Sequence, residues 1–291
     1  MIQSKCRYVF WLFFVISLIK ADDYQSQCPP TTASIERILQ DAHILGIVAT
    51  VVSSAGIIHE QGIGYHSPPI SEQRQPMDSS KSIFVLASIS KTFIVVAAMQ
   101  MVESNRLNLD TDINQYLPSQ MKIIHPHHPN VKITTRHLLS HTSGIGPNFL
   151  EELQQYLPGD TFAQTNLGDV IEKYLSNKTN WLPIPPGNKT FYSNMGSCLA
   201  AYIVERLAGI SFEQFVQDKI LKPLGIDEKN GGYRLSNFQD NTKSLVDHYI
   251  FNASWLEIYQ DMLPQLNISR VSLENITSIT DHSFDNLTRP I

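Results

Sequence analysis

The segment Ser88-Ile89-Ser90-Lys91 places a serine and a lysine three positions apart. On a helix this spacing puts Ser88 and Lys91 on one face, with Ser88 at the helix N-terminus, where the dipole favours a developing negative charge. A buried lysine can have a lowered pKa and accept the serine proton, so the two could act as nucleophile and base. The alternative is structural: Ser88 caps the helix and Lys91 extends from the core to solvent.

A second polar group, Tyr192-Ser193-Asn194, directly precedes another predicted helix. A tyrosine phenol beside a lysine ammonium ionises more easily and can serve as a general base. Asn194 could hold both the lysine and a substrate amide. The alternative interpretation is a loop tyrosine followed by an asparagine that caps the helix.

The helices and strands that must position these side chains are predicted from the spacing of apolar residues and from turn residues. Residues 88–103 are apolar nearly all round, which predicts a buried helix. Two β-branched runs, 46–53 and 57–64, flank Ala55-Gly56 and predict a β-hairpin. Helix signals of periodicity and capping also occur near residues 31–42, 136–139, 167–175, 195–207 and 211–222.

Composition narrows the classes of partner. The chain has 291 residues, of which 42% are hydrophobic and 17% charged, with a formal net charge of −5. These values are typical of a globular protein, and a mildly acidic chain without a basic block is a poor candidate for binding nucleic acid or an anionic membrane. We therefore expect a small-molecule or peptide substrate, no nucleic acid and no stable insertion into a membrane.

Residues 1–21 have the layout of a secretory signal peptide. Lys5 and Arg7 form a positive region, residues 8–19 are apolar, and Ala21 is a plausible cleavage position. The apolar run is shorter than the roughly 20 residues that span a bilayer. Secretion is the prediction, and an uncleaved signal anchor that leaves the protein on the extracellular side is the alternative.

Other features agree with export. Cys28 and Cys198 could form a disulfide in an oxidising compartment or remain two thiols. N-glycans are expected on some of the six Asn-x-Ser/Thr sequons, at Asn177, Asn188, Asn252, Asn267, Asn275 and Asn286.

His125, His127 and His128 lie among prolines in a predicted loop, and we expect neither a metal nor another cofactor.

Several segments, in order, resemble the serine β-lactamase-related family, which includes class C β-lactamases, D-alanyl-D-alanine carboxypeptidases and esterases. The stretch 84–93 is similar to the nucleophile segment of that family, and the resemblance covers roughly residues 30–226. It implies an α/β (α+β) fold in which a helical region packs on an antiparallel sheet. We expect a signal peptide at 1–21, this domain at 22–226 and an unassigned glycosylated tail at 227–291. Further similar segments are 107–118, 137–145, 186–196 and 223–226.

The resemblance implies a secreted serine acyl hydrolase that acts on an amide or ester bond. Ser88 would form an acyl-enzyme that water then hydrolyses, while Lys91 and Tyr192 share the proton transfers. Asn194 would orient the lysine and the substrate, and the backbone N–H of Ser88 would belong to the oxyanion hole. The stretch 141–144 is interpreted as structural, a helix end packed near the site.

A third motif of the family, Lys or His, any residue, then Gly on a late strand, has no match at the expected place. Lys229-Asn230-Gly231 fits the string, but residues 229–232 predict a turn. The sheet is therefore expected to be incomplete. Two alternatives to an active hydrolase follow: an inactive binding or regulatory homologue, and a truncated fragment that lacks the third motif.

Overall fold

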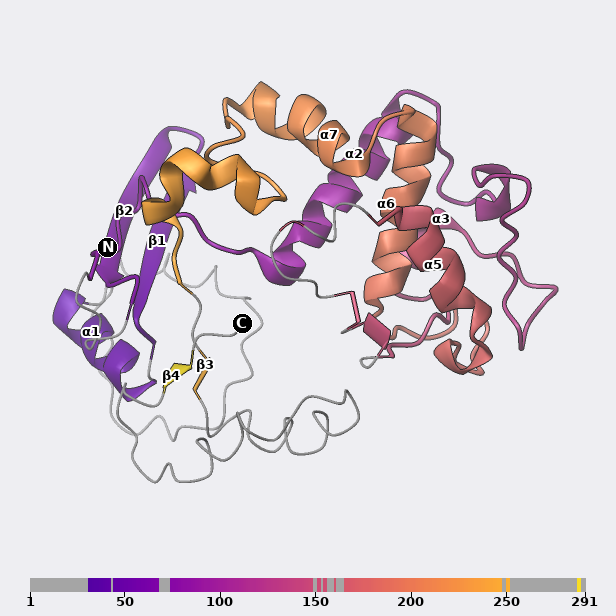
Figure 1. The fold of residues 1–291 in the computed structure, drawn as a ribbon, viewed down its shortest axis with the longest axis horizontal. Coiled ribbons are helices and arrows are strands. Elements are labelled where there is room, and N and C mark those ends of the chain that lie inside the picture. Colours follow the sequence, from indigo (N-terminus) through magenta and orange to yellow (C-terminus); the bar gives the residue numbers. More distant parts are fainter. Residues whose placement is uncertain are drawn as a thin grey trace, which may run out of the picture.

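The structure is a computed structural model that describes residues 31–42, 44–67, 74–148, 151–152, 154–155, 160, 165–247, 250–251 and 287–288 (Figure 1). The predicted signal peptide, Cys28 and four of the six sequons lie outside these residues. The expectations about them stay predictions.

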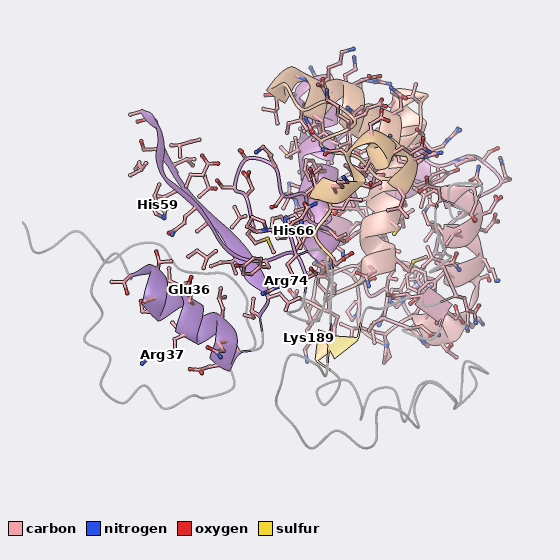
Figure 2. The ribbon with its side chains drawn as sticks, turned by 60° about the vertical axis from the view of Figure 1, so that its left-hand side comes forward. Glu36, Arg37, His59, His66, Arg74 and Lys189 are labelled. Carbon is pink, nitrogen blue, oxygen red and sulfur yellow. The ribbon has the colours of Figure 1, made fainter. Side chains whose placement is uncertain are left out.

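The predicted hairpin is confirmed. Strands β1 (Gly46–Ser53) and β2 (Gly56–Gly64) pair antiparallel, and their register is irregular between Val51 and Val52. Helix α1 (Thr32–Asp41) contacts β2 and begins where the Thr31 hydroxyl accepts the Ser34 N–H. The hairpin and α1 lie to one side of the other helices, and Figure 2 shows the hairpin extending away from them.

Much of the apolar surface of the hairpin is exposed. Val51 is 50% exposed, and Val52, Ile57 and Ile58 are more exposed still. Within the described residues, the other paired strands are β3 (Ile250–Phe251) and β4 (Leu287–Thr288), of two residues each. The expectation of a mixed α/β fold is thus confirmed, and the expectation of an incomplete sheet stays a prediction.

Helix α6 (Asn194–Ala208) is the centre of the helical part. It contacts α2 (Lys91–Glu103), α3 (Thr135–Leu139), α5 (Leu167–Ser176) and α7 (Phe212–Val216) (Figure 1). The Ser193 hydroxyl caps α6 by accepting the Gly196 N–H, and Gly209 ends it with a φ of 74°. Nine α6 residues are buried, so this helix carries much of the hydrophobic core.

Helix α2 is buried on one face only. Ala97, Ala98 and Met101 are buried, and α2 contacts both α6 and α7. Val95 and Met99, in contrast, are 40% and 43% exposed. The prediction of a helix is confirmed from Lys91 onward, but the prediction that it is buried all round is wrong, because its packing in the described structure leaves the other face open.

The segment after α7 continues in a π-helical turn, Gln217–Leu221, and a 3₁₀ turn, Lys222–Leu224. The predicted turn at 229–232 is confirmed, because the Asn230 and Gly231 N–H groups both donate to Asp227 O. A 3₁₀ segment, Leu235–Ser244, then returns toward the nucleophile segment, where Ile83 N donates to Ser244 O at 2.7 Å.

Candidate active site

Ser88 lies on a 3₁₀ turn, Ala87–Ser90, that leads directly into α2. Ala87 has a φ of 44°, a left-handed conformation that is uncommon for a residue with a side chain. Strained backbone of this kind costs about 1–3 kcal/mol and often occurs at functional sites. The turn exposes Ser88 to solvent and sets it one helical turn from Lys91.

Three of the four predicted catalytic side chains meet. Lys91 Nζ donates to Ser88 Oγ at 3.1 Å, and Tyr192 Oη donates to the same oxygen at 2.7 Å. The lysine nitrogen also lies 5.0 Å from the centroid of the Tyr192 ring. Ser88 Oγ is therefore held between an ammonium and a phenol, although Tyr192 is 104 positions away in the chain.

This geometry can activate a serine. A contact of 2.7 Å between two hydroxyl oxygens allows either one to be the donor, so the serine proton has a direct path to the tyrosine. A neutral phenol cannot take up a second proton, so Tyr192 would act as the base in its ionised form. The arrangement suits a nucleophile whose base is a tyrosine supported by a lysine.

Tyr192 is positioned by His141. The two rings are tilted by 39° with centroids 4.5 Å apart, and His141 Nδ1 accepts the Ser193 N–H at 3.2 Å. Burial, and then the charge of Lys91, lower the pKa of His141, which favours the neutral ring that can accept this bond. The sequence predicts a structural role for the stretch 141–144, and the structure gives His141 of this stretch a direct contact with a predicted catalytic side chain.

Asn194 is the fourth predicted side chain and the first residue of α6. The hydrogen bond that the structure gives its amide is to Glu152: Asn194 Nδ2 donates to Glu152 Oε2 at 2.6 Å. Glu152 is 8% exposed and was not found by sequence reasoning. An isolated glutamate at the end of an irregular stretch carries no motif, so only a three-dimensional contact could reveal it.

Within the part of the chain that the structure describes, no group of three or more His, Cys, Asp or Glu side chains could hold a metal ion. His125 is fully buried, with its ring 5.0 Å from those of His128 and Trp181. Cys198 forms no disulfide among the described residues, and Cys28 lies outside them, so their pairing stays an open question.

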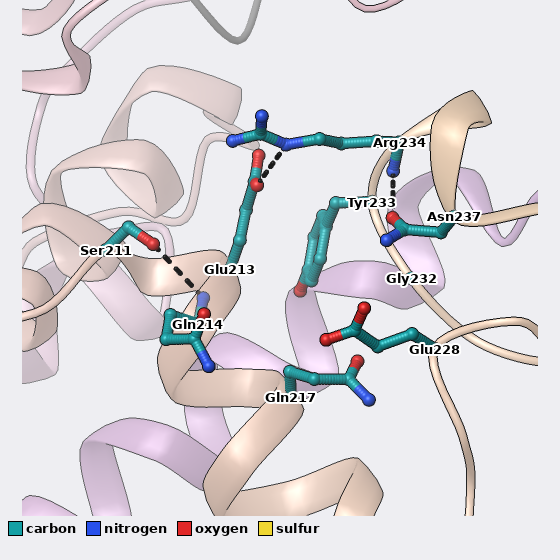
Figure 3. A pocket seen from close by; sticks show the side chains of 9 residues that line it. All are labelled: Ser211, Glu213, Gln214, Gln217, Glu228, Gly232, Tyr233, Arg234 and Asn237. Carbon is teal, nitrogen blue, oxygen red and sulfur yellow. Dashed lines mark hydrogen bonds and ion pairs between the residues drawn. The ribbon is translucent and has the colours of Figure 1, made fainter.

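A hollow of about 340 Å³ lies elsewhere, between α7 and the segment around 228–237. Figure 3 shows Tyr233 pointing into it between Glu213 and Glu228, while Arg234 forms an ion pair of 2.7 Å with Glu213. It shares no residue with the group around Ser88. That group lies instead at an open surface, with Tyr192 49% exposed.

Comparison with known proteins decides the family. Residues 32–233, more than two thirds of the chain, match the family described as Beta-lactamase. The chain belongs to the beta-lactamase family. The resemblance identified from the sequence is thereby confirmed.

Curated relatives extend well beyond the matched region. Penicillin-binding protein 4* of Bacillus subtilis (strain 168) is 26% identical over 204 residues, which are 69% of this chain and 41% of that protein. Protein flp of Staphylococcus aureus (strain MW2) is 27% identical over 70% of this chain and 38% of its own length. The chain therefore spans about two fifths of the length of these relatives.

Solved structures agree on the fold. An octameric penicillin-binding protein homologue from Pyrococcus abyssi matches with a TM-score of 0.61 and 26% identity, over 75% of this chain and 47% of that one. EstCE1, a hydrolase with promiscuous acyltransferase activity, matches with a TM-score of 0.58 and 26% identity, over 75% and 55% of the two chains. The β-lactamase/transpeptidase-like fold is that of serine hydrolases and supports acyl-hydrolase chemistry in general.

Proposed function

We propose that this protein is a serine acyl hydrolase that cleaves an amide or ester bond through Ser88. The observation that carries the proposal is the position of Ser88 Oγ, 3.1 Å from Lys91 Nζ and 2.7 Å from Tyr192 Oη. The strained Ala87 beside the serine and the membership of the beta-lactamase family support it.

In the proposed reaction, Tyr192 acts in its ionised form: Ser88 Oγ attacks the carbonyl carbon of the substrate and the serine proton moves to the phenolate oxygen of Tyr192. The negative charge that develops on the carbonyl oxygen is stabilised in part by the Ser88 backbone N–H. The bond to the leaving group breaks as that group takes up the proton, which leaves an ester between the acyl group and Ser88. Water attacks this ester with Tyr192 and Lys91 as proton carriers, and the acid and the free serine result.

The surroundings of Ser88 indicate the kind of substrate. Leu86, Ile89 and Phe191 adjoin the site residues in the chain, and each is at least 42% exposed. Exposed apolar side chains can pack against an apolar part of a bound molecule. A peptide or ester with an apolar group next to the scissile bond therefore suits this surface.

Secretion with N-glycosylation remains part of the proposal. Asn188 is exposed, whereas the side-chain nitrogen of Asn177 donates to Glu151 Oε1 at 2.6 Å. Of these two sequons, Asn188 is the more accessible acceptor. Among the described residues no single helix is long and apolar enough to span a membrane; α6 and the segment 212–224 would pass that test only as a pair bent by 76°.

Labelling with a fluorophosphonate probe tests the proposal. Purified wild type is expected to be labelled, and Ser88→Ala to lose the label. Ser90→Ala is the matched control, because Ser90 lies on the same turn and its side chain makes no capping bond. A folded wild type without any label, or a Ser88→Ala variant that still labels, would refute catalysis through Ser88.

The second candidate is an inactive binding homologue. It is favoured by the open surface around Ser88 and by the finding that Lys229-Asn230-Gly231, which fits the third motif as a string, forms a turn. A protein of this kind would bind a fluorescent penicillin reversibly, without a covalent adduct. Recovery of all the ligand after denaturation would support it, and a stable adduct would exclude it.

A further inference from the structure

Two neighbouring glutamates make different contacts. Glu151 Oε1 accepts from Asn177 Nδ2 at 2.6 Å, and Glu151 Oε2 accepts from Asn180 Nδ2 at 2.7 Å. Glu152 instead accepts from Asn194, the first residue of α6 and a predicted catalytic side chain. The first carboxylate therefore holds a loop, and the second holds the candidate active site.

Glu152 is a buried carboxylate supported by hydrogen bonds. Its Oε2 accepts from Asn194 Nδ2 at 2.6 Å, and Tyr174 Oη lies 3.4 Å from its Oε1. The structure gives it no ion pair among the described residues. A buried charge without a cation is costly unless hydrogen bonds compensate it, so the contact with Asn194 is strongly favoured.

The chemistry of this contact sets the orientation of the Asn194 amide. An ionised carboxylate can only accept hydrogen bonds, so the amide atom that faces it must be the nitrogen. The amide oxygen is then turned away from Glu152. If the carboxylate were absent, the nitrogen and oxygen of Asn194 could exchange places by rotation of the amide.

The charge of Lys91, the first residue of α2, acts on the same part of α6 as the charge of Glu152. Burial raises the pKa of the Cys198 thiol to about 11, the charge of Lys91 opposes this shift, and the charge of Glu152 adds to it. Cys198 is one helical turn after Asn194, so both charges act at the first turn of α6. An amide fixed there by Glu152 has its oxygen available to a cationic donor such as Lys91.

We propose that Glu152 is a positioning residue of the active site, which fixes the Asn194 amide with its nitrogen toward the carboxylate and its oxygen free to accept from Lys91 or from the substrate. The inference rests on the proposed hydrolase function. It adds a side chain that acts through Asn194 and does not touch the reacting atoms.

The test compares rates of labelling at Ser88 by a fluorophosphonate probe. Glu152→Gln keeps the size of the side chain but removes its charge, and its amide can present either oxygen or nitrogen to Asn194. We expect labelling about 10- to 100-fold slower, because small displacements of a catalytic group cost factors of this order. Glu151→Gln is the matched control, and its rate is expected to stay within about twofold of wild type, since the hydrogen bonds that the structure gives the Glu151 carboxylate are to Asn177 and Asn180 and not to Asn194.

A double-mutant cycle separates positioning from a general loss of structure. In an Asn194→Ala background the amide is absent, so the added Glu152→Gln change is expected to slow labelling no further. Equal factors in both backgrounds, or a Glu152→Gln single variant that labels at the wild-type rate, would overturn the proposal. If Glu152→Gln fails to fold, Glu152→Asp is used in its place, since it keeps the charge and shortens the reach to Asn194.

A spectroscopic signature separates this inference from the proposed function. In ¹⁵N–¹H NMR spectra, one side-chain amide proton of Asn194 is expected at an unusual downfield position, which is lost in Glu152→Gln and kept in Glu151→Gln. If wild type shows this signal but no labelling, the hydrolase function fails while the contact stands. If the signal is absent in folded wild type, the positioning role of Glu152 is refuted whatever the labelling shows.

Discussion

Acidification is expected to destabilise the folded protein through His125. This side chain is fully buried, its Nδ1 accepts the His127 N–H at 3.2 Å, and its ring lies beside His128 and Trp181. Burial, and then the charges of His128 and His127, lower the pKa of His125 from 6.5 to about 4. The folded state therefore keeps the ring neutral at pH values where the unfolded chain is already protonated.

The sign and size of the effect follow from proton linkage. Because the unfolded state binds the extra proton, stability is highest above pH 6.5 and falls as the pH is lowered toward the folded pKa. One proton over one pH unit is worth about 1.4 kcal/mol. The contribution of His125 alone to the loss is thus about 2 kcal/mol at pH 5 and about 3 kcal/mol at pH 4.

The assay is urea unfolding of wild type and His125→Phe at several pH values between 7.5 and 4. The variant cannot take up the proton, so its free energy of unfolding should fall less steeply as the pH is lowered. The difference between the two curves removes the titration of carboxylates and other histidines that both proteins share. His127→Gln is the control, because His127 is exposed and its removal should leave most of the wild-type slope.

Parallel curves for wild type and His125→Phe would refute the reasoning. They would mean that His125 titrates alike in the folded and unfolded states, in spite of its complete burial. A steeper loss in the variant would refute the sign of the effect. Either result would also mean that burial and the charges of His128 and His127 do not lower the pKa of His125 in the folded protein.

Three further outcomes are expected. Tyr192→Phe should slow probe labelling about 10²- to 10⁴-fold with little change in melting temperature, and an unchanged rate would exclude the phenol as proton carrier. Gly144→Ala should lower the free energy of unfolding, measured in urea, by more than about 2 kcal/mol. The backbone of Gly144 has a φ of 80°, and a Cβ added there would meet His125 Nε2 at 2.5 Å. An unchanged free energy of unfolding would contradict this packing. Asp110→Asn should change stability little, because the Arg136–Asp110 pair is more than half exposed, and a large loss that persists in high salt would contradict this.

Much of the fold was predictable because its signals are local. Thr134 and Ser211 cap α3 and α7 through hydrogen bonds within one turn, and the β-branched runs of the hairpin flank a turn of two residues. Such features depend on neighbours three or four positions away. Local signals also marked the segment that contains Ser88 and the one that contains Tyr192, and the order of similar segments indicated the family.

The pattern of apolar residues did not predict which elements pack against each helix. An all-apolar stretch indicates that α2 can be buried on every side, but the partners on each face come from distant parts of the chain. In the described structure α6 and α7 cover one face, and Val95 and Met99 on the other remain 40% and 43% exposed. The prediction failed there because a pattern of side chains does not specify the elements packed against it.

The sequence by itself determined the candidate residue types, the capped helices, the hairpin and the membership of a family. Only the tertiary structure brought Tyr192 to 2.7 Å from Ser88, placed the His141 ring against the tyrosine and set Glu152 on the Asn194 amide. These contacts join residues from 42 to 104 positions apart. Their distances depend on how α2 and α6 pack and on where the intervening loops return, which no local pattern of residues encodes.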